Sequence, residues 1–208
     1  MTRPPRPTPL YSFVALVSWP VIKFAFRYRT DGKEHLPASG GYVLAAGHVS
    51  NLDPWAIGLA IWPRRFLRFM AKSELFWFPM AQSVAGAGAF KVNRGQADRE
   101  AIETAVRLAR DGNVIAMFPE GTRRKKGLRK RYEAGAHTGA ARIALEAGVP
   151  LVPAGIKGTD GLRRLDQWRV RYGAPVDIDD LRGQDVAEVA REATDRLMAA
   201  INTLEQSL

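Results

Sequence analysis

Two residues that can take part in proton transfer lie five positions apart in the segment 47–54, Gly-His-Val-Ser-Asn-Leu-Asp-Pro. His48 follows a short apolar run, and Asp53 stands directly before a proline. A carboxylate beside an imidazole fixes one ring tautomer and stabilises the imidazolium that forms when the ring takes a proton from a hydroxyl. Asp followed by Pro is also typical of the start of a helix, here over 55–61. From spacing alone, both roles of Asp53 stay open.

Two further clusters combine cations with glycine at the ends of apolar runs. The segment 118–123 reads Phe-Pro-Glu-Gly-Thr-Arg, and the segment 88–95 reads Gly-Ala-Phe-Lys-Val-Asn-Arg-Gly. A glycine permits close backbone approach to a ligand, a threonine donates a hydroxyl hydrogen bond, and an arginine binds phosphate with its planar fork. Glu120 can orient arginine side chains or a substrate hydroxyl. Taken singly, each cluster is equally typical of a surface turn.

Together these segments resemble the 1-acylglycerol-3-phosphate acyltransferases (lysophosphatidate acyltransferases) of the glycerolipid acyltransferase family. That family carries four ordered blocks. The first, Asn-His-x4-Asp, resembles 47–53, and the second, ending Gly-x-Ile-Phe-x-Asp-Arg, resembles 88–94. The third, Phe-Pro-Glu-Gly-Thr-Arg, is identical at 118–123, and the fourth, a Val-Pro-x-x-Pro strand, matches 149–153. Four blocks in order are more specific than any one of them.

The resemblance implies direct transfer of an acyl group from acyl-CoA or an acyl carrier protein to the free hydroxyl of lysophosphatidate, which gives phosphatidate without a cofactor. His48 would act as the base and Asp53 would orient it. The acceptor's phosphate would be bound by Arg94, Glu120, Gly121, Thr122 and Arg123. Relatives that share the blocks act on glycerol 3-phosphate or on other lysolipids and glycolipids, so these acceptors are alternatives.

Three positions depart from the family pattern. Gly47 replaces the usual Asn, Asn93 stands where Asp is common, and Lys91 takes the place of an apolar residue. The His48–Asp53 pair is unaffected. The departures concern substrate contacts, and they leave the acceptor open.

The charge of the chain predicts an anionic partner. The formal net charge is +10 at pH 7. Seven of the nine residues at 123–131 are basic, namely Arg123, Arg124, Lys125, Lys126, Arg129, Lys130 and Arg131. A surface of this kind binds nucleic acid or anionic lipid. A nucleic-acid-binding domain explains the charge but not the four blocks, so we expect this run to attract the acyl donor or lipid head groups instead.

Residues 1–29 are predicted to associate with a membrane. The stretch 7–22 is uncharged, with basic residues on both sides of it. It is shorter than the roughly 20 apolar residues of a spanning helix, and Pro20 is expected to interrupt it. Aromatic side chains among basic flanks suit a helix that lies in the bilayer interface, and a helix that covers the protein's own core is the alternative. We expect peripheral or monotopic association with the cytoplasmic face of the cell membrane.

Residues 30–208 are predicted to form one α/β domain with a mixed, largely parallel sheet flanked by helices. Apolar runs typical of strands lie at 42–46, 66–70, 89–92, 114–118, 151–156 and 169–172. Helical periodicity lies at 97–111, 135–147 and 185–205. In such sheets the ligand-binding loops gather where strands end and helices begin, and the motifs fall at those junctions.

Several kinds of chemistry are not expected. The chain has no cysteine, which excludes disulfides and thiolate catalysis. His35, His48 and His137 have no metal-ligand spacing, so no metal site is expected. His137 falls within the predicted helix 135–147, where a structural role is the expected one. Ser50 lies between His48 and Asp53, but no Gly-x-Ser-x-Gly elbow is present, so no acyl-enzyme is expected.

Overall fold

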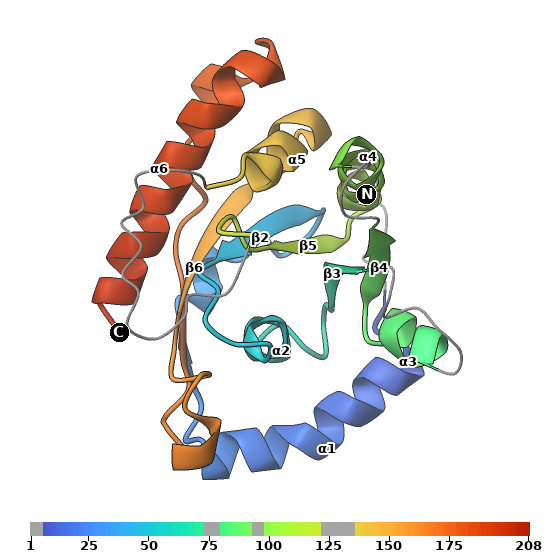
Figure 1. The fold of residues 1–208 in the computed structure, drawn as a ribbon, viewed down its shortest axis with the longest axis vertical. Coiled ribbons are helices and arrows are strands. Elements are labelled where there is room, and N and C mark those ends of the chain that lie inside the picture. The colour runs from blue at the N-terminus through green and yellow to red at the C-terminus, as the bar shows by residue number, and fades with distance from the viewer. Residues whose placement is uncertain (1–5, 73–79, 93–97, 122–135) are drawn as a thin grey trace.

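The computed structural model describes residues 6–72, 80–92, 98–121 and 136–208 (Figure 1). These residues form one α/β domain around a seven-stranded sheet with the order β1-β7-β6-β2-β5-β3-β4. Neighbouring strands are parallel except for β6 and β7, which are antiparallel. The strands are β1 (Arg29–Asp31), β2 (Tyr42–Ala46), β3 (Leu67–Lys72), β4 (Ala89–Val92), β5 (Val114–Met117), β6 (Leu151–Lys157) and β7 (Arg169–Tyr172). The predicted mixed, largely parallel sheet is confirmed.

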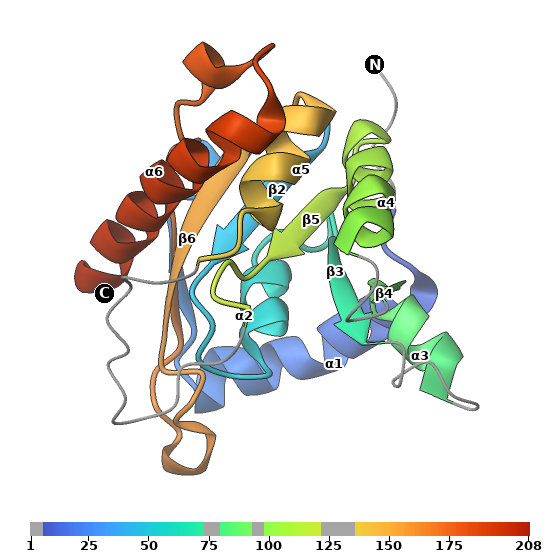
Figure 2. The same cartoon turned by 45° about the horizontal axis from the view of Figure 1, so that its top comes forward.

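Helices cover both faces of the sheet (Figures 1 and 2). One face carries α1 (Pro9–Ala25) and α2 (Asp53–Leu59), and the other carries α4 (Asp98–Arg110), α5 (Gly139–Ala147) and α6 (Val186–Gln206). Along β2, Leu44 belongs to the first core, whereas Val43 and Ala45 belong to the second. Because the central strands are buried on both faces, they are continuous apolar runs rather than alternating ones. A short helix, α3 (Met80–Gly86), precedes β4.

The helix α1 is continuous, so the expectation that Pro20 interrupts it was wrong. It begins at its N-cap Thr8, whose hydroxyl accepts a hydrogen bond from Tyr11 N at 3.0 Å. Proline removes one hydrogen bond from a helix interior, but Tyr11, Ala15 and Ile22 pack this helix into the core under the sheet, which holds it together.

Among the helices that the structure describes, none combines the length and the apolar content that crossing a membrane requires.

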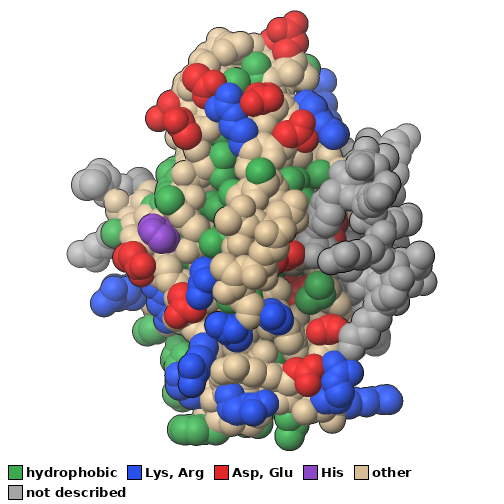
Figure 3. All heavy atoms as spheres, turned by 90° about the vertical axis from the view of Figure 1, so that its left-hand side faces the viewer, with side chains coloured by type: hydrophobic (Ala, Val, Ile, Leu, Met, Phe, Trp, Pro, Cys, Tyr) green, Lys and Arg blue, Asp and Glu red, His purple; other side chains and the backbone are tan. Residues whose placement is uncertain are grey.

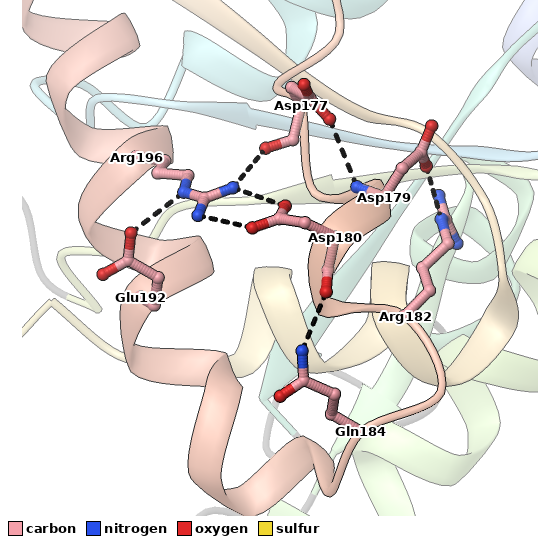
Figure 4. A network of polar contacts seen from close by, with 7 residues as sticks. All are labelled: Asp177, Asp179, Asp180, Arg182, Gln184, Glu192 and Arg196. Carbon is pink, nitrogen blue, oxygen red and sulfur yellow. Dashed lines mark hydrogen bonds and ion pairs between the residues drawn. The ribbon is translucent and has the colours of Figure 1, made fainter.

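The C-terminal helix α6 is tied to the loop before it by polar contacts (Figure 4). Its N-cap Asp185 accepts a hydrogen bond from Ala187 N at 2.8 Å. The guanidinium of Arg196 donates to both carboxylate oxygens of Asp180, at 2.7 and 2.8 Å, and to Glu192 at 2.9 Å. These groups are largely exposed, so each pair contributes little energy on its own, and the network mainly fixes the path of the chain into α6.

Candidate active site

Three neighbouring parallel strands end at the same edge of the sheet and bring distant residues together. His48 follows β2, Glu120 follows β5 and Thr159 follows β6. β2 pairs in parallel with both of the others, so all three loops lie at the carboxyl edge. Ligand sites of α/β sheets form at this edge. The expectation that the sequence motifs lie where strands end is therefore met for the first and third blocks, whereas the fourth block, 149–153, spans the start of β6.

His48 and Asp53 are in direct contact. His48 Nδ1 lies 2.8 Å from Asp53 Oδ2, and the same oxygen accepts hydrogen bonds from Val49 N and Ser50 N, both at 2.7 Å. Asp53 is the first residue of α2, after Leu52, and no side chain caps this helix. The alternative role of Asp53 as an N-cap is therefore wrong, because its carboxylate bonds to the loop before the helix and to the imidazole.

The contact fixes the tautomer of His48. A carboxylate accepts hydrogen bonds, so Nδ1 carries the ring proton and Nε2 is the basic nitrogen. The ring stacks on Phe118 of the third block, with centroids 4.4 Å apart and planes inclined by 26°. Asp53 is fully buried while the His48 side chain is 18% exposed, so the pair presents only its imidazole end to solvent. Such a pair can accept a proton from a bound hydroxyl.

Thr159 is a contact of Asp53 for which the sequence gives no signal. Its hydroxyl donates to Asp53 Oδ1 at 2.5 Å, and the residue is buried. Thr159 lies 106 positions after Asp53 and just beyond the fourth block. Only the parallel pairing of β2 with β6 brings the two together. The buried carboxylate thus has four hydrogen-bond donors, which offset the cost of removing its charge from water.

Ser50 serves the turn between His48 and Asp53. Its backbone N–H donates to Asp53, and its hydroxyl oxygen accepts a hydrogen bond from Leu52 N at 3.2 Å. The Ser50 hydroxyl therefore bonds the backbone of its own loop, which is the arrangement of an ST-turn. The Nδ1 atom of His48 bonds Asp53 and not Ser50.

The third block contacts the loop that carries the pair. Glu120 Oε1 accepts a hydrogen bond from His48 N at 3.3 Å. Gly121 has φ +67°, and a Cβ at this position would lie 2.6 Å from the ring of His137, so glycine is required by both the backbone and the space. His137 N donates to Pro119 O at 2.7 Å. The glutamate therefore joins the loops after β2 and β5.

The expected helical position of His137 was wrong. The helix α5 starts at Gly139, and His137 lies before it as an exposed residue beside the third block. The reason is the backbone hydrogen bond from His137 N to Pro119 O, which holds this part of the chain on the loop after β5 instead of in a helical turn. His137 is thus close to the site, although its spacing gave no indication of this.

Other predicted site residues lie outside the described residues. They are Arg94, Thr122 and Arg123 of the phosphate pocket, and Arg124, Lys125, Lys126, Arg129, Lys130 and Arg131 of the basic run. Of the predicted phosphate pocket, the structure describes Glu120 and Gly121. Within the described ranges, no three His, Asp or Glu side chains lie together as a group that could hold a metal ion.

Comparison with known proteins gives the family. A family model described as Acyltransferase matches residues 27–157, which include His48, Asp53 and the third block. The chain belongs to the acyltransferase family. The 1-acyl-sn-glycerol-3-phosphate acyltransferase of Bacillus subtilis is 28% identical to it, over 96% of this chain and 98% of the relative.

Other relatives of this acyltransferase are longer than it. The bovine 1-acyl-sn-glycerol-3-phosphate acyltransferase alpha is 30% identical over 81% of this chain, which spans only 61% of that relative's length. The crystal structure of the 1-acyl-sn-glycerophosphate (LPA) acyltransferase PlsC from Thermotoga maritima has a TM-score of 0.60, with 23% identity over 94% of this chain and 81% of that one. This likeness supports the fold described above.

Buried tyrosines hold the helix that carries Asp53 of this acyltransferase. Tyr28 Oη donates to Ala56 O at 2.5 Å, and Tyr172 Oη donates to Ile57 O at 2.7 Å. The carbonyls of a helix's last turn lack partners within the helix, so these hydroxyls satisfy two of them in α2. Burial raises the pKa of both tyrosines, which therefore stay protonated and act as donors.

Proposed function

We propose that this acyltransferase moves a fatty acyl group from an acyl thioester to the free hydroxyl of lysophosphatidate, giving phosphatidate. The observation that carries the proposal is the hydrogen bond from His48 Nδ1 to the buried Asp53 carboxylate, at a sheet edge shared with the Phe-Pro-Glu-Gly loop. The relatives from Bacillus subtilis and cattle are named for the same reaction. Glycerol 3-phosphate and other lysolipids or glycolipids are the alternative acceptors.

The proposed reaction needs one base and no covalent enzyme intermediate. His48 Nε2 takes the proton of the acceptor hydroxyl while its oxygen attacks the thioester carbonyl, and the tetrahedral intermediate collapses by breaking the C–S bond. The imidazolium returns the proton to the leaving thiolate. Asp53 stays ionised throughout and stabilises the imidazolium. Atoms and charges balance without a cofactor, so acyl-CoA or acyl carrier protein enters only as the second substrate.

The acceptor's phosphate is proposed to bind residues of the second and third blocks. Arg94, Thr122 and Arg123 supply donors for phosphate oxygens, and Gly121, at φ +67°, shapes the turn of the third block. Glu120 is a carboxylate and would repel a phosphate, so its part in the pocket is to hold the neighbouring loop through His48 N. The basic run 124–131 attracts the acidic acyl donor or anionic head groups.

The proposed site works at a membrane, on which α1 docks. On the side of α1 that faces away from the core, the helix exposes Leu10, Phe13, Val14, Leu16, Val17, Val21 and Phe24. An exposed apolar stripe of this length marks an interaction surface, and basic flanks such as Lys23 suit anionic lipid. We place this contact at the cytoplasmic face of the cell membrane, where acyl thioesters are available.

The experiment compares acceptors and donors on the purified protein. Lysophosphatidate and glycerol 3-phosphate are each supplied with palmitoyl-CoA and with palmitoyl-acyl carrier protein, and products are identified by mass spectrometry. We expect phosphatidate from lysophosphatidate, and at least about 10²-fold less of it from folded His48→Ala protein. Acylation of glycerol 3-phosphate in preference to lysophosphatidate would overturn the proposed acceptor while leaving the reaction type intact. In the same assay, Arg123→Ala should raise the KM for lysophosphatidate.

A further inference from the structure

The turn between β6 and β7 exposes two leucines. Leu162 and Leu165 are 49% and 50% exposed. Within the described part of the chain, every large hydrophobic side chain that is exposed belongs either to α1 or to this turn. We propose that residues 161–166, the Leu162 turn, form a second contact with an anionic phospholipid bilayer beside α1. The proposal rests on the membrane docking of α1 proposed above.

The Leu162 turn lies beside the C-terminal end of α1. Figures 1 and 2 both show the short 3-10 helix of the turn, Leu162–Arg164, next to this end of the helix. The Arg27 guanidinium donates to Leu165 O at 3.1 Å, and Trp168 N donates to Phe26 O at 3.0 Å. The rings of Phe26 and Trp168 lie 4.8 Å apart. These contacts join the turn to the end of the helix, so the two present one surface.

The backbone of the Leu162 turn is held in a form that keeps its leucines in water. Leu165 has φ 52°, a conformation uncommon for a residue with a branched apolar side chain. Arg164 donates to the Asp166 carboxylate at 2.6 Å, and a Cβ on Gly161 would lie 1.8 Å from the same side chain. Because the turn is strained and buries neither leucine, the two leucines contribute little to the core. Contact with an external apolar partner explains why they are leucines better than a role in folding does.

The charge around the Leu162 turn favours a lipid surface over an apolar protein patch. Arg163 and Arg164 stand between the two leucines and are exposed. Residues 157–169 contain four basic and two acidic side chains, and Arg27 adds another cation. Figure 3 shows Lys and Arg side chains gathered at the lower end of this face, with hydrophobic ones at its edge. In contacts with a bilayer interface, apolar side chains such as leucine enter the interface while neighbouring arginines bind the lipid phosphates.

The position of the turn links it to the candidate site. It begins two residues after Thr159, whose hydroxyl bonds Asp53. A bilayer that contacts the Leu162 turn therefore lies at the side of the protein on which β6 ends. The carboxyl edge that carries His48 is then close to the surface where the head group of a lysolipid lies. Two membrane contacts, α1 and the Leu162 turn, would also fix the tilt of the domain relative to the bilayer. A single helix would leave this tilt free.

The absence of cysteine from the chain allows a direct test. Single-cysteine variants Leu162→Cys, Phe13→Cys and Glu188→Cys are labelled with an environment-sensitive fluorophore and mixed with phosphatidylglycerol vesicles that contain spin-labelled lipid. Phe13 reports on α1, and Glu188 is an exposed residue of α6. We expect lipid quenching at positions 13 and 162 and none at 188.

The other outcomes separate this inference from the proposed function. Quenching at position 13 alone would overturn the second contact and leave the docking of α1 standing. Quenching at neither position would overturn both. Equal quenching at all three positions would indicate adsorption without orientation and would also overturn the second contact.

A second measurement uses side chains rather than probes. The variant Leu162→Gln/Leu165→Asn keeps the backbone of the turn, because asparagine tolerates a positive φ. Its partition onto phosphatidylglycerol vesicles should fall about tenfold, since two half-exposed leucines no longer enter the interface. Arg163→Gln should weaken binding more than the matched Arg191→Gln on α6. Wild-type partition by the double variant, with an unchanged melting temperature, would overturn the inference.

Discussion

At the scale of single residues, the candidate site is governed by one buried carboxylate. Asp53 is fully buried, yet it accepts hydrogen bonds from two backbone N–H groups, the His48 imidazole and the Thr159 hydroxyl. An unpaired buried charge would be costly, whereas one with this many donors is fixed in position. A fixed carboxylate in turn fixes the ring of His48, which is the group that meets solvent.

The first prediction concerns His48. His48→Ala should lower kcat by about 10²- to 10⁴-fold, because the acceptor hydroxyl loses its general base. Phosphatidate formation from lysophosphatidate measures the effect, and circular dichroism checks that the variant is folded. Appreciable turnover by the folded variant would remove His48 from the role of base.

The second prediction concerns Thr159. Thr159→Val keeps the volume but removes a hydrogen bond to a charged group, so kcat should fall about 10- to 100-fold while the KM values for both substrates stay near those of the wild type. Thr159→Ser restores the hydroxyl and should restore most of the rate. A purely structural role would instead lower the melting temperature of both variants and leave the kcat of the folded fraction unchanged.

Residue by residue, spacing predicted some contacts and missed others. His48 and Asp53 are only five positions apart, so a short sequence motif can predict their contact. Thr159 depends on the pairing of two strands that are distant in the chain, so no local pattern marks it. His137 was misplaced because a run of small residues looks helical throughout, although a backbone hydrogen bond to Pro119 keeps it out of α5.

At the scale of elements, α2 is the piece that carries Asp53 into place. It is a short helix, and isolated helices of this length are unstable in water. It is held instead by packing and by the hydroxyls of Tyr28 and Tyr172, which come from segments on either side of it in the sequence. The position of the carboxylate therefore depends on groups that never touch a substrate.

The third prediction tests this anchoring. Tyr28→Phe leaves the buried Ala56 carbonyl without its donor, so the free energy of unfolding should fall by about 1–3 kcal/mol. Urea denaturation measures it. The control is Thr203→Val, which removes an exposed hydroxyl that bonds its own helix and should change stability by less than about 0.5 kcal/mol. Equal effects of the two variants would mean that the Tyr28 hydroxyl does not anchor α2.

The elements themselves were largely predictable from the sequence. All six predicted strands are present, with ends that differ by at most two residues, because buried parallel strands are continuous apolar runs. The strand β1 was missed since it has three residues, Arg29–Asp31, and lies at the sheet edge. Strand order was not predictable, because it depends on which neighbours share a buried surface rather than on any one run of residues.

At the scale of the whole molecule, buried tyrosines make the stability of the fold depend on pH. Burial raises the pKa of Tyr42 to about 12, with Arg65 opposing the shift, and it raises the pKa values of Tyr11, Tyr28 and Tyr172 further. Four of the five tyrosines of the chain thus stay protonated in the folded state at pH values where they ionise in the unfolded state. Their contribution to the free energy of unfolding is fully present below pH 10, the ordinary pKa of a tyrosine.

The fourth prediction follows from this sign. As pH rises above 10, the unfolded state loses tyrosine protons that the folded state retains, so the free energy of unfolding should fall. Each such tyrosine contributes a slope of about 1.4 kcal/mol per pH unit. Urea denaturation across this range measures it, and Tyr42→Phe should make the slope shallower by one such contribution. A stability that is constant above pH 10 would contradict the burial of these hydroxyls.

The last prediction separates membrane docking from folding, because α1 takes part in both. Tyr11, Ala15 and Ile22 face the core, whereas Phe13 and Phe24 face water, the latter at 79% exposure. Deleting residues 1–29 should therefore lower the melting temperature as well as vesicle binding. Phe13→Gln/Phe24→Gln should weaken sedimentation with phosphatidylglycerol vesicles about tenfold or more at an unchanged melting temperature, because only the outer face is altered. Undiminished sedimentation of the folded double variant would show that the basic residues hold the protein at the membrane without α1.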